Sequence, residues 1–265
     1  MTEAMRVVLA RNPSPMTLDG TRTFVVGRVR PVVVDPGPAL PEHLAAVEAA
    51  LDGARPAAIL LTHGHADHAG CAAALAERTG APLMMGRGAL SSAVAPEAVA
   101  RWLADGDEVE TDAGVLRAVA TPGHAPEHLA FLWSQEGNGR VLFVGDHLMG
   151  EGDTTLVAPP EGDLAAYLDS LERLRTVGAD ALFPAHGPPL HDPAGALARY
   201  REHRMARIEQ VRAALRQGGP ARPDALVRRV YGAELHPALV RAAEGSLTAI
   251  LRYLEGRGEV DGLEP

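Results

Sequence analysis

The stretch Leu60–Gly70, LLTHGHADHAG, places three histidines and an aspartate directly after an apolar run. The run 57–63, AAILLTH, is short and almost continuously apolar, which predicts a β-strand buried on both faces. The sequence DHAGCAAALAERTG that follows predicts one helix, ending at Gly80. The polar cluster therefore lies where a buried strand gives way to a helix.

The four polar side chains of this stretch are typical metal ligands. His63 and His65 are two residues apart, so in an extended segment they point the same way. Asp67 and His68 open the predicted helix and supply a second pair. Imidazole and carboxylate groups suit zinc, and also iron or manganese. Four ligands are too few for two metal ions, so further ligands are expected elsewhere.

Three other strand ends supply such ligands. TPGH ends at His124, LFVGD ends at Asp146, and LFPAHG contains His186, each after an apolar run. Rigid strands commonly present functional groups in the loops at their ends. The alternative, surface or capping residues, would require four separated strand ends to carry ligand chemistry by coincidence. The pattern therefore predicts a metal site.

Short strand patterns alternate with helical ones as far as residue 190. The segments 23–27 and 31–37 predict a hairpin pair, and HLAFLWS and RVLFVGDH predict another around QEGNG. Helices are expected at 41–51 and 163–177, the second with Asp163 as its N-cap. Further strands are expected in APLMMG, in 114–124 and in 180–189.

From about Pro193 the pattern becomes helical throughout. One long helix, one short helix and a third helix with a Gly-punctuated end predict a winged-helix-like module. The expected division is a catalytic domain at 1–192 and a C-terminal domain at 193–265. The tail 199–265 carries 12 arginines and nine acidic residues, a balance of +3. Because the whole chain has a formal charge of −9, residues 1–198 carry a balance of −12. Such an acidic part argues against a broad polyanion-binding face.

Composition narrows the class of protein further. Of the 265 residues, 46% are hydrophobic, which is enough for a core. No apolar stretch approaches about 18 residues, so no membrane span is expected. The first residues do not resemble a signal peptide. The single cysteine, Cys71, excludes an intrachain disulfide and fits a reducing compartment, so we expect the cytoplasm.

The motifs HGHADH, PGH, GD and AHG, in this order, resemble the metallo-β-lactamase superfamily over residues 5–190. The resemblance implies an α/β (α+β) fold, an αββα sandwich of two face-to-face sheets with helices outside. It also implies a metal-dependent hydrolase with a dinuclear site. The implied ligands are His63, His65 and His124 for one metal, then Asp67, His68 and His186 for the other, with Asp146 as the bridging carboxylate.

The chain also resembles a narrower group within this superfamily, the β-lactamase-like protein 2 group. The stretches that carry this resemblance are NPSPMTLDGTRTFVVG, PAHGPPL and YREHRMARIEQV. This resemblance implies the winged-helix tail. Some members of the group are metal-dependent endoribonucleases, and related sequences include polyketide-type thioesterases. The chain departs from the usual pattern of the group at Arg22, Phe24 and the segment GHAPEH. These departures weaken the inference of a substrate from the group, but not the inference of the metal site.

The expected chemistry is hydrolysis by a metal-bridging hydroxide, with zinc as the first choice and iron or manganese as alternatives. Asp67 is expected to orient the hydroxide as well as to bind metal. The preferred substrate is a small-molecule ester or thioester, and the alternative is single-stranded RNA. A β-lactam ranks last, because β-lactamases of this superfamily usually lack the bridging carboxylate. A metal-sensing DNA-binding regulator is the non-enzymatic alternative.

Several further residues keep two interpretations. His128 is either a catalytic residue, as a substrate contact or proton donor, or a packed, hydrogen-bonded strand residue. His147 is expected to point away from the metals, and Thr154 and Thr155 are candidates for the cleft wall. Arg199, Arg201, Arg204 and Arg207 favour a solvated helix face over a nucleic-acid patch. The surface is expected to carry His43, His191, His203 and His236. The tail is expected to cover the cleft or to form a homodimer contact.

Overall fold

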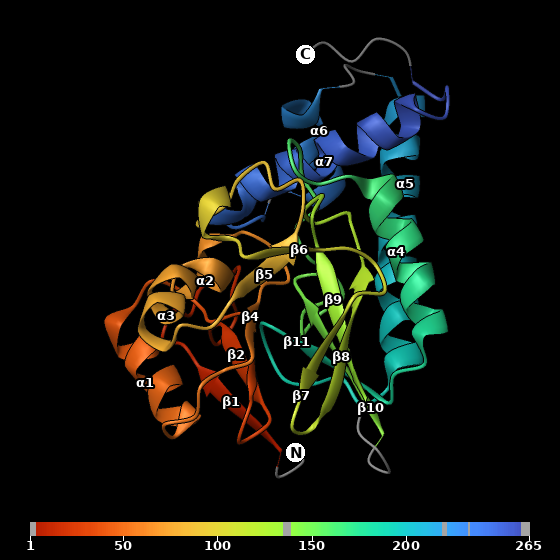
Figure 1. Cartoon of the computed structure of the whole chain (residues 1–265). Coiled ribbons are helices and arrows are strands. Elements are labelled where there is room, and N and C mark those ends of the chain that lie inside the picture. The colour runs from red at the N-terminus through yellow and green to blue at the C-terminus, as the bar shows by residue number, and fades with distance from the viewer. Residues whose placement is uncertain (1–3, 135–138, 219–221, 233, 261–265) are drawn as a thin grey trace.

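Two β-sheets pack face to face between two layers of helices in the computed structural model (Figure 1). The structure describes residues 4–134, 139–218, 222–232 and 234–260. The first sheet has the order β1 (Met5–Leu9), β2 (Arg22–Val26), β3 (Val32–Val34), β4 (Ala58–Leu60), β5 (Leu83–Gly86) and β6 (Arg101–Leu103). Strands β1 to β3 pair antiparallel, and β3 to β6 pair parallel.

The second sheet has the order β11 (Ala181–Pro184), β10 (Arg140–Gly145), β9 (Leu129–Ser134), β8 (Gly114–Ala120) and β7 (Glu108–Thr111). Only the β10–β11 pair is parallel among these neighbours. The outer face of the first sheet packs against α1 (Pro41–Leu51) and α3 (Ala72–Thr79), and that of the second against α4 (Leu164–Val177) and α5 (Pro193–Arg216). This confirms the αββα sandwich.

The alternation of side chains along β9 shows how one strand serves two layers. Leu129, Phe131 and Trp133 face the space between the sheets, whereas Ala130 and Leu132 face the helices. Successive side chains of a strand point to opposite faces, so a strand buried on both sides is apolar at every position. The same holds for β4, whose three residues are all buried as predicted.

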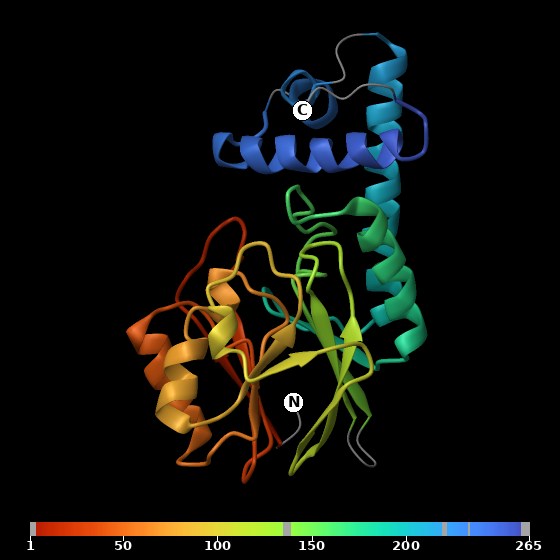
Figure 2. The same ribbon diagram turned by 45° about the horizontal axis from the view of Figure 1, so that its top comes forward.

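The C-terminal helices belong to the same core as the second sheet. Leu197 and Tyr200 of α5, with Leu247 and Ile250 of α7 (Val240–Glu255), join one buried cluster with Tyr167 of α4. The short helix α6 (Pro223–Tyr231) contributes to it as well. Figure 2 shows α7 crossing above the open ends of the sheets.

The three helices of the tail are therefore present as expected, but the winged-helix assignment stays a prediction. Within the described part of 193–260, only helices and the 3₁₀ turn Pro237–Leu239 are found, and no strand that would form a wing. The division at residue 192 also stays a prediction. Because the tail shares a core with α4, it does not have the separate core that an independent domain usually has.

The prediction of one continuous helix from Asp67 to Gly80 is wrong. The stretch 67–80 forms two helices, α2 (Ala66–Ala69) and α3 (Ala72–Thr79). The Cys71 amide donates to the Gly37 carbonyl at 2.9 Å, and the backbone of Ala39 lies against Gly70. This close approach interrupts the helical hydrogen bonds. The strands β1, β6 and β7 were not predicted, and residues 135–138 of the QEGNG turn lie outside the described residues.

The N-cap of α4 is confirmed, since an Asp163 carboxylate oxygen accepts from the Ala166 amide at 2.9 Å. Such a cap fixes where the segment from Asp146 to Asp163 joins the helix layer. Among the described residues, no helix combines the length and apolarity needed to span a bilayer. The cytoplasmic location stays a prediction.

Candidate metal centre

The ends of four strands meet at one edge of the sandwich. Strands β8 and β10 each run antiparallel to β9, and β11 runs parallel to β10, so all three end at the same edge. The first sheet joins them there, because the Leu129 amide donates to the Thr62 carbonyl at 2.8 Å. This arrangement brings together the seven side chains expected as ligands, His63, His65, Asp67, His68, His124, Asp146 and His186.

Three histidines form a first group. His63 Nε2 lies 2.9 Å from His65 Nδ1, which lies 3.1 Å from His124 Nε2. His63 is fully buried, and His124 is nearly so. Three imidazole nitrogens that converge at such distances have the arrangement of the protein ligands in a catalytic zinc site.

Asp67, His68 and His186 form a second group. Asp67 Oδ2 lies 3.3 Å from His186 Nε2 and 3.6 Å from His68 Nε2. Both histidines are fully buried, whereas the Asp67 side chain is 30% exposed. The second group can thus bind an ion while Asp67 still reaches solvent.

Asp146 lies between the two groups. Its Oδ1 is 3.2 Å from His68 Nε2 and 3.1 Å from His186 Nε2, while its Oδ2 is 3.7 Å from His124 Nε2. Gly145, immediately before it, has a φ of 49°, and a Cβ there would meet the Thr62 hydroxyl at 2.6 Å. Only glycine fits this turn, so the GD motif places a carboxylate that faces both groups.

Outward hydrogen bonds orient all five histidines. Nδ1 donates from His68 to Asp35, from His124 to the Leu156 carbonyl and from His186 to the Gly20 carbonyl. His63 Nδ1 lies 3.1 Å from the Thr62 hydroxyl, which itself donates to Asp35. His65 Nε2 donates to Glu161 at 2.6 Å. Since carbonyls and carboxylates accept only, these bonds turn the second nitrogen of each ring inward, where its lone pair can bind a metal once any proton on it is displaced.

The donor set fits a pair of divalent metal ions. His68 Nε2, His186 Nε2 and Asp146 Oδ1 are buried and have no hydrogen-bond partner in the described structure. Buried polar atoms are normally satisfied, and here the nearest atoms are other lone-pair donors. A shared cation satisfies such a cluster. The residues present therefore match the metal site that the sequence predicts.

Charge distinguishes the two groups. Burial, with the neighbouring His68 and His124, holds the pKa of His63 well below its ordinary value. In the second group burial opposes protonation of His186, but Asp146 and Asp67 outweigh it and raise its pKa to about 9. The same carboxylates, with Asp35, raise the pKa of His68 well above its ordinary value. Burial also lowers the pKa of His124, so without metal His63 and His124 favour the neutral form, whereas His68 and His186 favour the protonated form.

This contrast predicts unequal proton release when metal binds. A histidine with a raised pKa stays protonated up to that pKa, so at pH 7.5 an ion bound by His68 and His186 must displace protons. We expect about one to two protons released for the second group and almost none for the first. Calorimetric titration of metal-free protein with zinc, in buffers of different ionisation enthalpy, measures both numbers. Equal release for the two ions would contradict the assignment.

Asp35 is a functional candidate that sequence reasoning missed. It is buried, and its Oδ2 accepts from His68 Nδ1 at 2.9 Å and from the Thr62 hydroxyl at 2.8 Å. Its Oδ1 accepts from the Thr62 amide. Its φ of 49° is unusual for a residue other than glycine. The available signal was the DPG turn at the end of β3, beside the β4 strand end.

The substitution Asp35→Asn is expected to weaken metal binding by about 10- to 100-fold, because the amide cannot accept all three hydrogen bonds and His68 loses its orientation. Competition with a chromophoric chelator measures the affinity. Asp52→Asn is a matched control, since Asp52 also has a positive φ, of 51°, but is exposed at the end of α1. Equal affinities for the two variants would show that Asp35 does not orient His68.

Two glutamates were also missed. Glu127 is buried and its Oε1 accepts from the Gly64 amide at 2.9 Å, which holds the HGH loop. Glu127 belongs to the GHAPEH segment that departs from the family pattern, and this departure was the signal. Glu161 orients His65 from the segment between β10 and α4. Nothing in the local pattern of that segment indicated this role.

His128 has the position expected of a packed, hydrogen-bonded strand residue, which was one of its two interpretations. It is 1% exposed, and its Nδ1 shares a hydrogen bond of 2.8 Å with the Thr121 hydroxyl. It does not line the cavity beside the metal ligands. The placement therefore does not favour substrate contact, and the catalytic role of His128 stays a prediction. His147 is buried against the Tyr167 ring, and burial, with His124 and Arg204, lowers its pKa to about 3.

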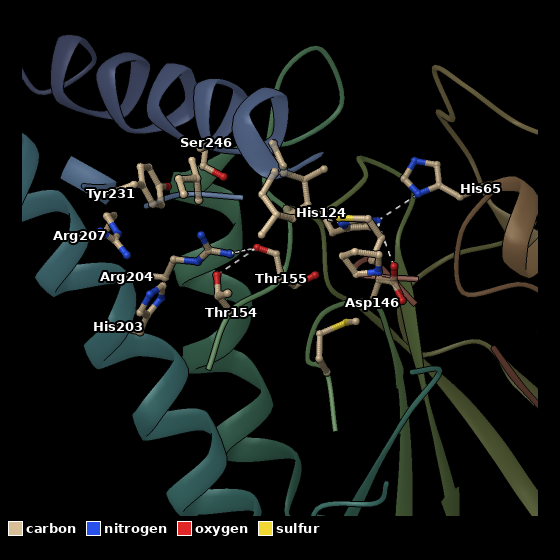
Figure 3. A pocket seen from close by; sticks show the side chains of 18 of the residues that line it. His65, His124, Asp146, Thr154, Thr155, His203, Arg204, Arg207, Tyr231 and Ser246 are labelled. Carbon is tan, nitrogen blue, oxygen red and sulfur yellow. Dashed lines mark hydrogen bonds and ion pairs between the residues drawn. The ribbon is translucent and has the colours of Figure 1, made fainter. Parts of the chain in front are cut away.

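A cavity of about 390 Å³ opens beside the ligands (Figure 3). His65, Asp67, His124 and Asp146 line one part of it, and its other walls come from the segment 149–156 and from α5, α6 and α7. Thr154 and Thr155 line the wall as expected. The tail therefore covers the cleft, in agreement with one of its two expected roles. The homodimer contact stays a prediction.

Four expectations about surface residues are wrong. His43 is buried in α1, where its Nε2 lies 2.9 Å from the Thr23 hydroxyl. His203 and Arg207 line the cavity, and Arg204 is 4% exposed rather than solvated. The helical pattern does not reveal this, because α5 turns one polar face inward, toward the cavity. His191, His236, Arg199 and Arg201 are exposed as expected.

The segment between β10 and α4 connects this tail to the ligands. The Tyr200 hydroxyl donates to the Met149 carbonyl at 3.0 Å. The same hydroxyl accepts a hydrogen bond of 2.8 Å from the Met149 amide. Arg204 donates to the Thr155 carbonyl, next to the Leu156 carbonyl that orients His124. A residue of α5 is thus one peptide away from a hydrogen bond that orients a ligand.

Comparisons with known proteins agree with this geometry. The family model described as "Metallo-beta-lactamase superfamily" matches residues 17–186. The chain is 32% identical to an "Atrochrysone carboxyl ACP thioesterase" from Aspergillus chevalieri, over 96% of this chain and 81% of that protein. It is 30% identical to a "Beta-lactamase-like protein 2 homolog" from Caenorhabditis elegans, over 98% of this chain and 87% of that protein.

A solved structure shows that the fold extends over the tail. A metallo-beta-lactamase family protein from Thermus thermophilus superposes with a TM-score of 0.81 at 23% identity. The superposition covers 100% of this chain and 97% of that chain, so it includes the helices from α5 onward. With the matched residues 17–186 and the ligand cluster in place, the chain belongs to the metallo-β-lactamase superfamily of hydrolases.

Proposed function

We propose that this protein is a two-metal hydrolase that cleaves a thioester or ester of a small acyl compound. The observation that carries the proposal is the cavity of about 390 Å³, which has the ligand cluster at one part and mainly apolar walls elsewhere. Its volume lies in the range of small-molecule pockets. The name of the thioesterase relative supports the same class of substrate.

Zinc is the proposed metal, with iron or manganese as alternatives, and the seven residues described above would hold two ions. Bound there, such ions would supply Lewis acidity at the scissile carbonyl and would activate water for attack at neutral pH. The chain's own residues do the rest. Asp67 reaches the cavity and accepts a hydrogen bond from the attacking water, which orients it. Met149 and Leu156 exclude bulk water from the acyl group.

No nucleophilic side chain is needed in this proposal. Cys71 is buried, its thiol lies 2.8 Å from the Pro38 carbonyl oxygen, and burial raises the pKa of that thiol. A thiol with a raised pKa is a poor nucleophile at neutral pH. Ser246 lines the cavity but has no histidine within hydrogen-bond distance among the described residues. The ligand cluster is therefore the proposed source of the nucleophile in the cavity.

A second candidate is hydrolysis of single-stranded RNA. The guanidinium carbon of Arg207 lies 4.3 Å from the Tyr231 ring centroid, and both residues line the cavity. Basic and aromatic groups together are typical of single-strand binding. The acidic balance of residues 1–198 and the small cavity favour the acyl substrate.

A comparison of substrates tests the proposal. Protein loaded with zinc, iron or manganese is offered a set of acyl thioesters and esters, an activated phosphodiester and single-stranded RNA. We expect thioesters or esters to be cleaved fastest, and chelation to abolish the reaction. Cleavage of RNA alone would favour the second candidate. Full thioester hydrolysis by thoroughly metal-free protein would overturn both.

A further inference from the structure

The cavity has two chemically different parts. One part carries the ligand cluster, with both of the acidic residues of the wall, Asp67 and Asp146. Away from the ligands, α5 presents His203, Arg204 and Arg207 to the cavity. Figure 3 shows these three side chains on the helical side, across from His65 and His124. The wall of this helical part contains no acidic residue among those described.

Arg204 is a buried cation without a carboxylate partner in the described structure. It is 4% exposed, and its guanidinium donates to the Thr155 carbonyl and lies 5.0 Å from the Tyr167 ring centroid. Its Nε is buried and has no hydrogen-bond partner. Burying a charge is costly unless a partner compensates it. Arg204 therefore leaves uncompensated positive charge at the cavity wall.

Arg207 strengthens this charge, whereas burial lowers the pKa of His203 and favours its neutral form. Arg207 donates to the Val230 carbonyl at 2.9 Å and to the Gln210 amide oxygen at 2.7 Å, both of which are neutral. Asp153 is the carboxylate beside His203, with its Oδ1 3.9 Å from His203 Nε2. Asp153 does not line the cavity. Two fixed cations on one face of α5 are thus held by neutral groups.

We infer that this helical part of the cavity is a subsite for an anionic group of the substrate, bound by Arg204 and Arg207. The inference rests on the proposed function, since it places the reacting acyl bond at the ligand cluster. Arginine presents a planar set of donors that matches carboxylates and phosphates. The anion is either a carboxylate on the acyl part or a phosphate on the thiol part of a thioester. Ser246 on α7 offers a hydroxyl to the same region.

Two pairs of compounds that differ only in the anionic group test the subsite. Glutarate and pentanoate differ in one carboxylate, and 4′-phosphopantetheine and pantetheine differ in one phosphate. Calorimetry measures their binding to the metal-loaded protein, so the test does not need turnover. We expect wild-type protein to prefer the anionic member of one pair by about tenfold or more, which also identifies the source of the anion.

Variants on α5 locate the preference. Arg207→Gln removes one charge and is expected to lower the preference at least tenfold. Arg204→Lys keeps the charge but loses the planar fork, and gives an intermediate value. Arg201→Gln is the matched control, because Arg201 is exposed on the same helix, and it leaves the preference unchanged. Glutaryl and pentanoyl thioesters of N-acetylcysteamine then test whether the preference extends to KM.

Three outcomes would overturn the inference. One is that neither pair differs in binding to wild-type protein, and another is that Arg207→Gln weakens both members of a pair equally. The third is an Arg201→Gln variant that loses as much preference as Arg207→Gln. A protein that binds the anions selectively but cleaves no thioester retains the subsite and contradicts the proposed function instead.

Discussion

The substitution Asp146→Asn is expected to lower kcat/KM by about 10³-fold or more on any ester or thioester that the wild-type protein cleaves. Asp146 is the one carboxylate that faces both histidine groups, with its two oxygens 3.1 to 3.7 Å from three ring nitrogens. The amide has the same shape but no charge, and its N–H₂ group faces lone pairs. A loss of about 4 kcal/mol of charge stabilisation corresponds to that factor.

Metal content separates a chemical effect from a failure to fold. Elemental analysis of Asp146→Asn is expected to show less than the full complement of two ions, while circular dichroism shows an intact fold. Asp169→Asn makes the same chemical change at an exposed position of α4 and should match the wild type. Wild-type activity and metal content in Asp146→Asn would contradict the bridging assignment.

A chain that ends at Asp192 is expected to lose cooperative folding. The truncation removes Leu197, Ile208 and Leu247, which are fully buried or nearly so, and uncovers Tyr167 and Leu171 of α4. Each buried side chain of this size contributes about 1.5–3 kcal/mol. Typical domains have a total stability of only about 5–15 kcal/mol. The tail contributes further buried side chains to this core, among them Tyr200, Val211, Ile250 and Leu254. The free energy of unfolding lost with all of them is expected to match or exceed the total stability of such a domain.

Thermal unfolding followed by circular dichroism measures this loss. A chain that ends at Glu255 is the control, because it keeps α7 and loses mainly the exposed ion pairs of Glu259 with Arg212 and Arg257. Exposed pairs contribute at most about 1 kcal/mol, so this chain should unfold cooperatively. A cooperative transition at the wild-type midpoint for the chain 1–192 would instead support a domain division at residue 192.

The sequence predicted a metal site because the ligands follow from local patterns at strand ends, whereas the αββα layers were implied by the resemblance to the superfamily. Strand β4 is apolar at every position, and histidines and aspartates that recur directly after such buried strands are typical of metal sites. The short strands β1, β6 and β7 have mixed burial, so their side chains give no clear alternation. The break at Gly70 depends on the remote segment 37–39, which no local pattern encodes.

The residues that orient the ligands were harder to predict than the ligands. Asp35 and Glu161 act through single hydrogen bonds to His68 and His65, made across 33 and 96 residues of chain. The inward face of α5 was missed for a similar reason. The helix carries charged residues at many positions, including Arg201, Glu202 and Glu209, so its sequence does not single out Arg204 and Arg207. Only the packing of α7 shows which side is covered.

The bonds from α5 to the segment after β10 have a consequence for the order of events during synthesis. Tyr200 and Arg204 hold Met149 and Thr155, yet they follow all seven ligands in the chain. A nascent chain that has emerged only as far as His186 contains every ligand but lacks the supports for the segment that orients His124. Domains form as units while the ribosome adds residues. Helix α5 leaves the ribosome after all seven ligands, so we expect it to complete the centre and expect a chain interrupted before it to be inactive although it carries every ligand.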